Sequence, residues 1–272
     1  MAIIPNSMIF KITLKVLEQG AQLPLSYQYE LSSWIYRLMG SADQPFATWL
    51  HNQGYDFQGK RFKLFTFSRL NIPKNSYQIR DDRMEINARF ISFRISFLVE
   101  KAAETMLLGM FQQQRLVLGD KKSRIALKVE QVELLPLPDF KPITYFRTSS
   151  PMVITQKTLT DDKEKYLHPL ETDFAQLFWH NIKSKYLQAV NYNLVEPLDL
   201  ENENFVLKII SSEKQVKSRL ITIKAFTPQQ TRIRGFLFDF TLKTSPKLLR
   251  LGLLAGFGAY CSQGFGSTRI LE

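Results

Sequence analysis

Few side chains in this sequence can transfer a proton near neutral pH. The chain contains three histidines, His51, His168 and His180, and one cysteine, Cys261. Histidine acts as a general acid or base because its ordinary pKa lies near working pH. His168 precedes a proline at a predicted helix start, and His180 falls opposite that helix's apolar stripe, which favours loop and surface roles. His51 is the remaining candidate, although a histidine taken alone is more often structural than catalytic.

The neighbourhood of His51 is strongly basic. Residues 51–80 hold six basic side chains against one acidic side chain, Asp56. Such a stretch suits contact with phosphate groups, and a nearby ammonium group could stabilise a phosphorane-like transition state. The six basic residues are Lys60, Arg61, Lys63, Arg69, Lys74 and Arg80.

Other kinds of catalytic site find no support in the sequence. His51 has no His, Cys or carboxylate at ligand spacing, so we expect no metal and no cofactor. No Gly-X-Ser-X-Gly elbow and no phosphate-binding Gly-Lys-Ser/Thr motif occurs. If the chain is an enzyme, its chemistry should therefore rely on proton transfer and cationic stabilisation. RNA permits that route, because its 2′-hydroxyl can attack the neighbouring phosphate and leave a cyclic phosphate.

Glycines cluster near the C-terminus. Five of the 12 glycines fall between Gly252 and Gly266, after a predicted helix and before a strand, which is the reverse of a dinucleotide-binding motif. The bare backbone could approach a phosphate chain closely, or the segment could serve only as a structural turn. We favour an exposed loop that RNA covers. Its candidate RNA contacts are Gly256, Gly258, Gly264 and Gly266.

The overall charge supports a polyanionic partner. The 272 residues include 36 Lys and Arg against 25 Asp and Glu, a formal charge of +11, and no apolar run approaches a membrane span. We therefore expect nucleic acid rather than membrane as the partner. A single cysteine forms no internal disulfide and favours a cytoplasmic location. The further basic residues expected to contact RNA are Lys121, Lys122, Arg124, Arg232 and Arg234.

The elements that must position these residues form a repeated order. A strand from residue 8 precedes a helix capped by Ser26, and a second helix starting near Asp43 carries His51 in its last turn. A strand at residues 62–70, two strand segments within 77–99, a helix and further strands complete a β, helices, β, β, α, β order. Residues 143–271 repeat this order and include a predicted strand at 233–242. The pattern predicts an α+β protein with two tandem ferredoxin-like (RRM-like) domains, 1–135 and 140–272, joined at the prolines of residues 135–139.

The glycine cluster resembles a known loop. Gly256-Phe-Gly258 followed by Gly264-Phe-Gly266 is similar to the glycine-rich loop of the repeat-associated (RAMP) superfamily of CRISPR proteins. Members of that superfamily bind CRISPR RNA through ferredoxin-like domains. Members that do not cut RNA share the loop, so the resemblance implies the superfamily and an RNA partner rather than an activity.

Three N-terminal segments carry a more specific resemblance. Residues 31–37, 46–51 and 59–68 are similar to the endoribonuclease that cuts CRISPR precursor RNA within each repeat. The catalytic tyrosine, histidine and lysine of its archaeal members fall here on Tyr36, His51 and Lys63. The resemblance implies a metal-independent cut that leaves 2′,3′-cyclic phosphate and 5′-hydroxyl ends, and it finds no counterpart for residues 1–7.

Two other functions stay open from the sequence. A non-cleaving RNA-binding subunit of a CRISPR effector complex would share the glycine loop but needs no histidine beside a lysine. A nonspecific nucleic-acid-binding protein would use the +11 charge but needs no ordered loop. As partners we expect CRISPR repeat RNA and a CRISPR effector complex, with the protein itself a monomer or homodimer.

Overall fold

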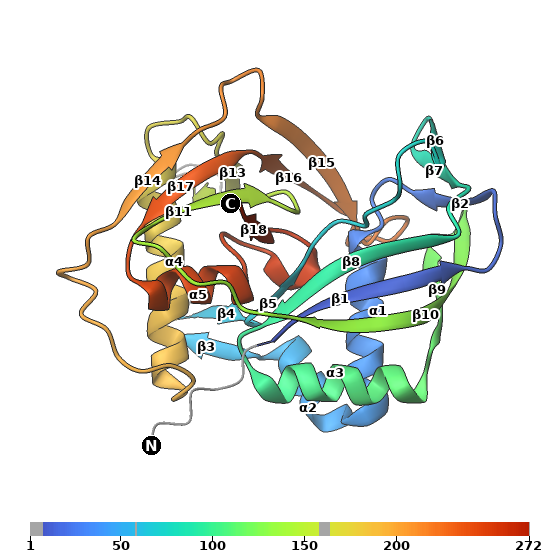
Figure 1. Cartoon of the computed structure of the whole chain (residues 1–272), viewed down its shortest axis with the longest axis horizontal. Helices are drawn as coiled ribbons and strands as arrows, with labels where there is room; N and C mark the ends of the chain where they lie inside the picture. Colours follow the sequence, from blue (N-terminus) through green and yellow to red (C-terminus); the bar gives the residue numbers. More distant parts are fainter. Residues whose placement is uncertain (1–7, 58, 158–163, 272) are drawn as a thin grey trace.

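The N-terminal half of the chain forms a five-stranded antiparallel sheet with its helices on one side (Figure 1). A computed structural model describes residues 8–57, 59–157 and 164–271. The strand order is β5-β8-β1-β10-β9, which places the first and third strands of a βαββαβ unit at the centre. These elements are β1 (Met8–Val16), α1 (Gln28–Ala42), β5 (Phe65–Phe67), β8 (Phe90–Phe97), α3 (Glu100–Gln112), β9 (Arg115–Gly119) and β10 (Arg124–Leu135).

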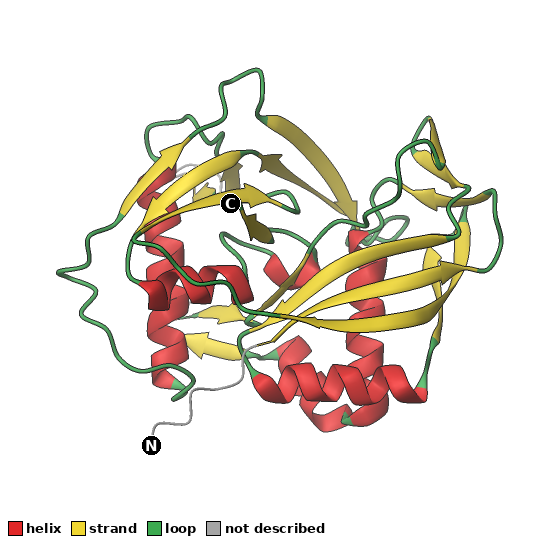
Figure 2. Cartoon of the chain, viewed as in Figure 1, coloured by secondary structure: helices red, strands yellow, loops and turns green. Residues whose placement is uncertain are grey.

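The C-terminal half repeats this topology with a four-stranded sheet of order β14-β17-β11-β18. Two ferredoxin-like units of an α+β protein are therefore present, as predicted (Figure 2). The elements are β11 (Ile143–Thr148), α4 (Phe174–Asn191), β14 (Val206–Ile209), β17 (Asp239–Lys243), α5 (Pro246–Ala255) and β18 (Thr268–Ile270).

Smaller elements extend both halves. The N-terminal half adds a short helix and two small antiparallel sheets, and the C-terminal half adds two β-hairpins and one turn of 3-10 helix. They are β2 (Ala21–Pro24), α2 (Gln44–Asn52), β3 (Tyr55–Phe57), β4 (Lys60–Phe62), β6 (Tyr77–Arg80), β7 (Arg83–Ile86), β12 (Thr155–Lys157), β13 (Glu164–Tyr166), β15 (Lys217–Ile223), β16 (Thr231–Leu237) and η1 (Cys261–Gln263).

Helix starts follow local capping rules in one case and not in another. The helix α2 begins next to Asp43, as predicted, and Asp43 caps it, because its carboxylate accepts the Phe46 backbone N–H at 3.0 Å. The prediction that Ser26 caps α1 is wrong. Tyr27 occupies the cap position without a side-chain bond, and the Ser26 hydroxyl accepts the Thr222 backbone N–H at 3.2 Å from the other half of the chain.

Two predicted strands are each divided by the fold. The predicted strand 62–70 breaks at Leu64, whose φ of 54° lies in the left-handed region and separates β4 from β5. The predicted strand 233–242 breaks at Phe238, because β16 pairs with β15 while β17 pairs with β11 and β14. In both cases the two parts of the strand belong to different sheets.

The two halves share one continuous hydrophobic core, which includes Phe97 from β8 and Phe146 from β11. The hairpin of β3 and β4 adds Tyr55 to this core and packs on α4, with a hydrogen bond from Gln188 Nε2 to the Tyr55 carbonyl. The rings of Tyr55 and Tyr192 meet edge to face at 5.1 Å. The predicted boundary at residues 135–140 falls between β10 and β11. The division of the chain into two domains at this boundary stays a prediction. Within the described residues no helix could cross a membrane.

Candidate active site

His51 and Tyr36 come together from two adjacent helices. His51 lies exposed in the last turn of α2, and Tyr36 lies in the middle of α1. Their rings meet edge to face with centroids 4.9 Å apart. The His51 Nδ1 lies 2.9 Å from the Asn52 Oδ1. When Nδ1 donates to that oxygen, Nε2 is left to accept or release a proton.

The phenol of Tyr36 is suited to donating a hydrogen bond rather than to abstracting a proton. Burial raises the pKa of Tyr36 well above its ordinary value, and a hydrogen bond with the Ser262 side chain only partly opposes that shift. The phenol therefore stays protonated at working pH. Its contacts with His51 and Ser262 place it between the α2 helix and the glycine-rich segment.

Lys63 contacts the backbone of His51 rather than its imidazole ring. Its Nζ donates to the His51 carbonyl oxygen at 2.8 Å. Burial, together with the charge of Arg61, lowers the pKa of Lys63 to about 8. Gly54 leaves room for this side chain, since a Cβ at Gly54 would lie 2.8 Å from the Lys63 Nζ. This role of Gly54 was not predicted, although a glycine just after a helix end marks such a close approach.

An open pocket of about 570 Å³ lies over α1 and α2 and is lined by Tyr36 and His51. Lys63 is not among its lining residues. The cation that does line it is Arg37, an exposed residue beside Tyr36 that the sequence analysis did not identify. Arg37 could have been identified from the sequence, because it lies outside the apolar stripe of α1 and next to the candidate Tyr36. The structure thus joins two of the three predicted residues in one pocket and adds a guanidinium group.

The glycine-rich segment is buried, so the prediction that it is exposed is wrong. Gly256, Gly258, Gly264 and Gly266 are all buried and all have positive φ. A Cβ at Gly258 would overlap the Val153 carbonyl oxygen. The segment packs between the halves, where its carbonyl groups accept the hydroxyls of Ser32 and Thr66 from α1 and β5. That these glycines contact RNA stays a prediction.

The predicted basic residues lie on separate surfaces. Lys60 and Arg61 belong to β4, where the Lys60 Nζ lies 2.9 Å from the His180 Nε2 and Arg61 donates to the Asn52 carbonyl at 3.3 Å. Arg69 follows β5 and donates its backbone N–H to Ser149. The other predicted residues are exposed in or beside the β9–β10 turn (Lys121, Lys122 and Arg124) and on β16 (Arg232 and Arg234).

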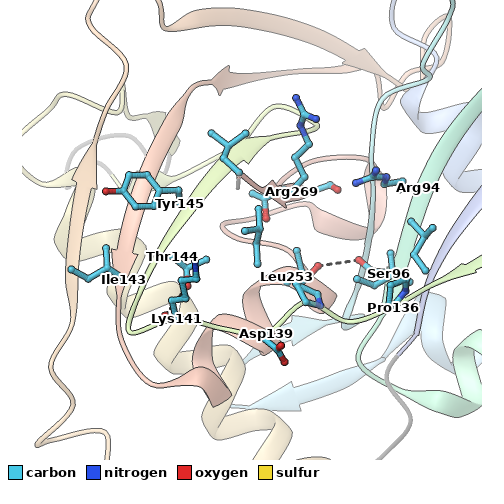
Figure 3. A pocket seen from close by; sticks show the side chains of 17 residues that line it. Arg94, Ser96, Pro136, Asp139, Lys141, Ile143, Thr144, Tyr145, Leu253 and Arg269 are labelled. Atoms are coloured by element: carbon cyan, nitrogen blue, oxygen red, sulfur yellow. Dashed lines mark hydrogen bonds between the residues drawn. The ribbon is translucent and has the colours of Figure 1, made fainter.

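A larger groove of about 920 Å³ separates the two sheets (Figure 3). One wall is β8, whose Arg94 and Ser96 alternate with buried residues, and the other is formed by β11 and β18. Its cationic side chains are Arg94, Lys141 and Arg269, against one carboxylate, Asp139. None of the predicted RNA contacts lines this groove. Arg94 and Arg269 are single basic residues within strands and Lys141 precedes β11, so the sequence did not distinguish them from ordinary solvated charges.

Among the described residues, no group of three or more His, Cys, Asp and Glu side chains could hold a metal ion.

Comparisons with known proteins agree over both halves. One family model, described as "CRISPR-associated protein Cas6, N-terminal", matches residues 22–130, and another, "CRISPR associated protein Cas6, C-terminal", matches residues 135–270. The chain is 28% identical to "CRISPR-associated endoribonuclease Cas6 1" of Methanocaldococcus jannaschii, covering 92% of this chain and 88% of that protein. It is 26% identical to a putative CRISPR-associated endoribonuclease-like protein Cas6 of Pyrococcus furiosus, covering 97% and 99%.

Solved structures share the fold. The product of a Cas6-related gene from Pyrococcus furiosus superimposes with a TM-score of 0.79 at 25% identity, covering 98% of this chain and 99% of that one. A RAMP protein described as binding different RNA substrates gives a TM-score of 0.78 at 22% identity, covering 97% and 100%. At that identity the second likeness concerns the fold alone.

The burial of the glycine-rich segment predicts that Gly258→Ala lowers the stability of the protein. Gly59→Ala is a matched control, because Gly59 also has positive φ but a Cβ there would meet nothing within 4 Å. The left-handed backbone alone should lower the free energy of unfolding by about 1 to 2 kcal/mol in each variant. Overlap with the Val153 carbonyl should add at least ~1 kcal/mol to the loss in Gly258→Ala. Urea denaturation measures both losses, and equal values would show that the packing of the segment is unimportant.

Proposed function

The chain belongs to the Cas6 family of CRISPR-associated endoribonucleases, and we propose that it cuts CRISPR precursor RNA within the repeat by attack of the RNA's own 2′-hydroxyl. The observation that carries this proposal is the pocket in which the His51 imidazole meets the Tyr36 ring, with Lys63 bound to the His51 carbonyl. The products are a 2′,3′-cyclic phosphate and a 5′-hydroxyl, and the released RNAs serve as guides.

The reaction requires two proton transfers. The 2′-oxygen loses its proton and forms a bond to phosphorus, while the bond from phosphorus to the 5′-oxygen breaks and that oxygen gains a proton. The His51 Nε2 is suited to one of these transfers because Nδ1 is occupied by Asn52. Tyr36, as a neutral phenol, is suited to hydrogen bonding with a phosphate oxygen or the reacting hydroxyl.

Negative charge that develops on the phosphate needs a cation. Lys63 and Arg37 are the candidates. Lys63 is hydrogen-bonded to the His51 backbone, and Arg37 lines the pocket. The ammonium of Lys63 lies partly buried, where its interaction with a phosphate is less screened than at the surface. Arg37 is exposed and suits a phosphate beside the one that is cut.

The groove between the sheets offers a path for the remainder of the RNA. Arg94, Lys141 and Arg269 line it with Tyr145, a half-exposed aromatic side chain suited to stacking on a base. Its volume of about 920 Å³ is large enough for unpaired nucleotides. Because the active-site pocket lies over α1 and α2, the two surfaces can engage different parts of one repeat.

Cleavage of a synthetic RNA with the sequence of the CRISPR repeat from the same genome tests the function directly. The reaction should proceed in excess EDTA, because an internal 2′-hydroxyl nucleophile needs no water held by a metal. A 2′-deoxy nucleotide just upstream of the cut should abolish cleavage and leave binding nearly intact. If the RNA binds tightly and stays uncut, the protein is instead a non-cleaving RNA-binding subunit. Cleavage that EDTA stops would refute the metal-independent mechanism.

Replacing His51 with Ala should lower the single-turnover cleavage rate by at least ~10², since general acid or base catalysis contributes about that much. The affinity for repeat RNA should change little, because such a group acts mainly in the transition state. His180→Ala is the control, being an exposed histidine outside the pocket. An equal loss of rate and affinity in His51→Ala would indicate a structural residue.

The lowered pKa of Lys63 gives a prediction about pH. Its ammonium loses the proton as pH rises through about 8, whereas an arginine at this position stays charged. The ratio of the wild-type rate to the Lys63→Arg rate should therefore fall between pH 7 and pH 9.5. Using the ratio cancels the titration of groups that both proteins share. A ratio that stays constant would assign the transition-state cation to another residue, with Arg37 next to be replaced.

Binding should depend on salt through phosphate contacts. The logarithm of affinity should fall linearly with the logarithm of salt concentration, by about 0.7 per phosphate contacted in single-stranded RNA. Arg94→Gln and Arg269→Gln should each make the slope shallower by about that amount. Lys247→Gln serves as the control, because the Lys247 Nζ is paired with Glu196 at 2.9 Å. Unchanged slopes in the two groove variants would exclude the groove as the RNA path.

A further inference from the structure

An exposed aromatic ring lies where the two halves of the chain meet above the N-terminal end of α1. Phe226 belongs to the loop between β15 and β16, and 43% of its surface is exposed. The Lys122 Nζ from the β9–β10 turn lies 5.2 Å from the centre of its ring. A cation therefore accompanies the ring, and the two side chains come from different halves of the protein.

The backbone holds Phe226 in an unfavourable conformation. Its φ of 61° lies in the left-handed region, which a bulky side chain rarely adopts. The Gln230 Oε1 accepts the Phe226 backbone N–H at 3.0 Å, and the Thr227 hydroxyl donates to the Lys224 carbonyl at 2.8 Å. Since the ring is half exposed, core packing does not explain this strain. Strain of this kind persists where it serves a site.

The surroundings of the ring are basic. Asp120, the carboxylate of the β9–β10 turn, is engaged by Arg83 at 2.6 Å and by two backbone N–H groups of its own turn. It therefore offers little repulsion to an incoming phosphate. The exposed cations of the turn and loop are Lys121, Lys122, Arg124 and Lys224.

The loop lies one helix length from the candidate active site. Thr222 at the end of β15 donates its N–H to Ser26, just before α1, whereas the pocket lies over α2 and the later turns of α1. With 15 residues, α1 is about 22 Å long. Figure 1 shows the end of β15 beside the top of α1, with α2 beneath its other end. A strand of RNA that starts in the pocket can therefore reach the loop several nucleotides away.

We propose that Phe226 and Lys122 form a stacking site for one unpaired base of the substrate RNA. The proposal rests on the proposed function, in which RNA is the ligand. A base stacks on an aromatic ring whatever its identity, and the adjacent ammonium binds the phosphate of the same nucleotide. The site would fix the register of the RNA relative to the cut.

A comparison of abasic RNAs tests this assignment. The probe is the repeat RNA described above, carrying a 2′-deoxy nucleotide upstream of the cut and one abasic position at a time. Wild-type affinity should fall about tenfold at one unpaired position, as expected for the loss of one stacked base. The Phe226→Leu variant should bind intact RNA about tenfold more weakly than the wild type. In this variant, the same abasic position should lower the affinity less than about threefold further.

Further variants separate stacking from folding. Phe226→Trp should retain wild-type affinity, and Phe226→Gly, which suits the left-handed backbone, should bind as weakly as Phe226→Leu without a lower melting temperature. Phe111→Leu on α3 is the matched control, because that ring is 78% exposed and lies outside the loop. Wild-type affinity in Phe226→Leu, or an identical abasic profile in both proteins, would overturn the proposal. A failure of the wild type to cleave would refute the proposed function instead, because the abasic comparison measures binding alone.

Discussion

The buried amine of Lys185 is the interaction on which the assembly of this protein depends. Only 2% of this residue is exposed, and its Nζ donates to the carbonyl oxygens of Gly256 and Gly258, both at 2.6 Å. A buried charge is costly unless such groups satisfy it. The carbonyls must therefore point at α4, which fixes the path of the glycine-rich segment. On its other side that segment binds α1 and β5, so α4 sets the position of the helix that carries Tyr36.

The candidate site combines short-range and long-range constraints. His51 is fixed locally, by the Asp43 cap at one end of its helix and by Gly54 just beyond the other. Lys63 reaches it because the chain turns back through β3 and β4. Tyr36 depends on contacts from the far end of the sequence, since its phenol bonds to Ser262. The candidate catalytic groups thus come from one half of the chain, and the other half holds one of them in place.

Features set by neighbouring residues were predictable, and features set by distant ones were not. The α2 cap, the order of elements and the place of His51 follow from capping and periodicity. The breaks at Leu64 and Phe238 arise because parts of each strand join different sheets, which no local pattern encodes. The apolar stripe of α4 contains Lys185, and a lysine inside such a stripe should have indicated a buried partner. Burial of the glycines was missed because bare backbone serves close packing as well as ligand contact.

The docking of the β3–β4 hairpin on α4 makes the candidate site depend on residues that are synthesised long after His51. Gln188, which binds the Tyr55 carbonyl, is made more than a hundred residues after the hairpin. Lys185 and the carbonyls that it binds are separated by a further seventy residues. The pocket itself is lined by the N-terminal half, but the contacts that hold Tyr36 and the β3–β4 hairpin come from residues that are made later. The positions of Tyr36 and of the hairpin that precedes Lys63 are therefore fixed only after α4 and the glycine-rich segment have been made.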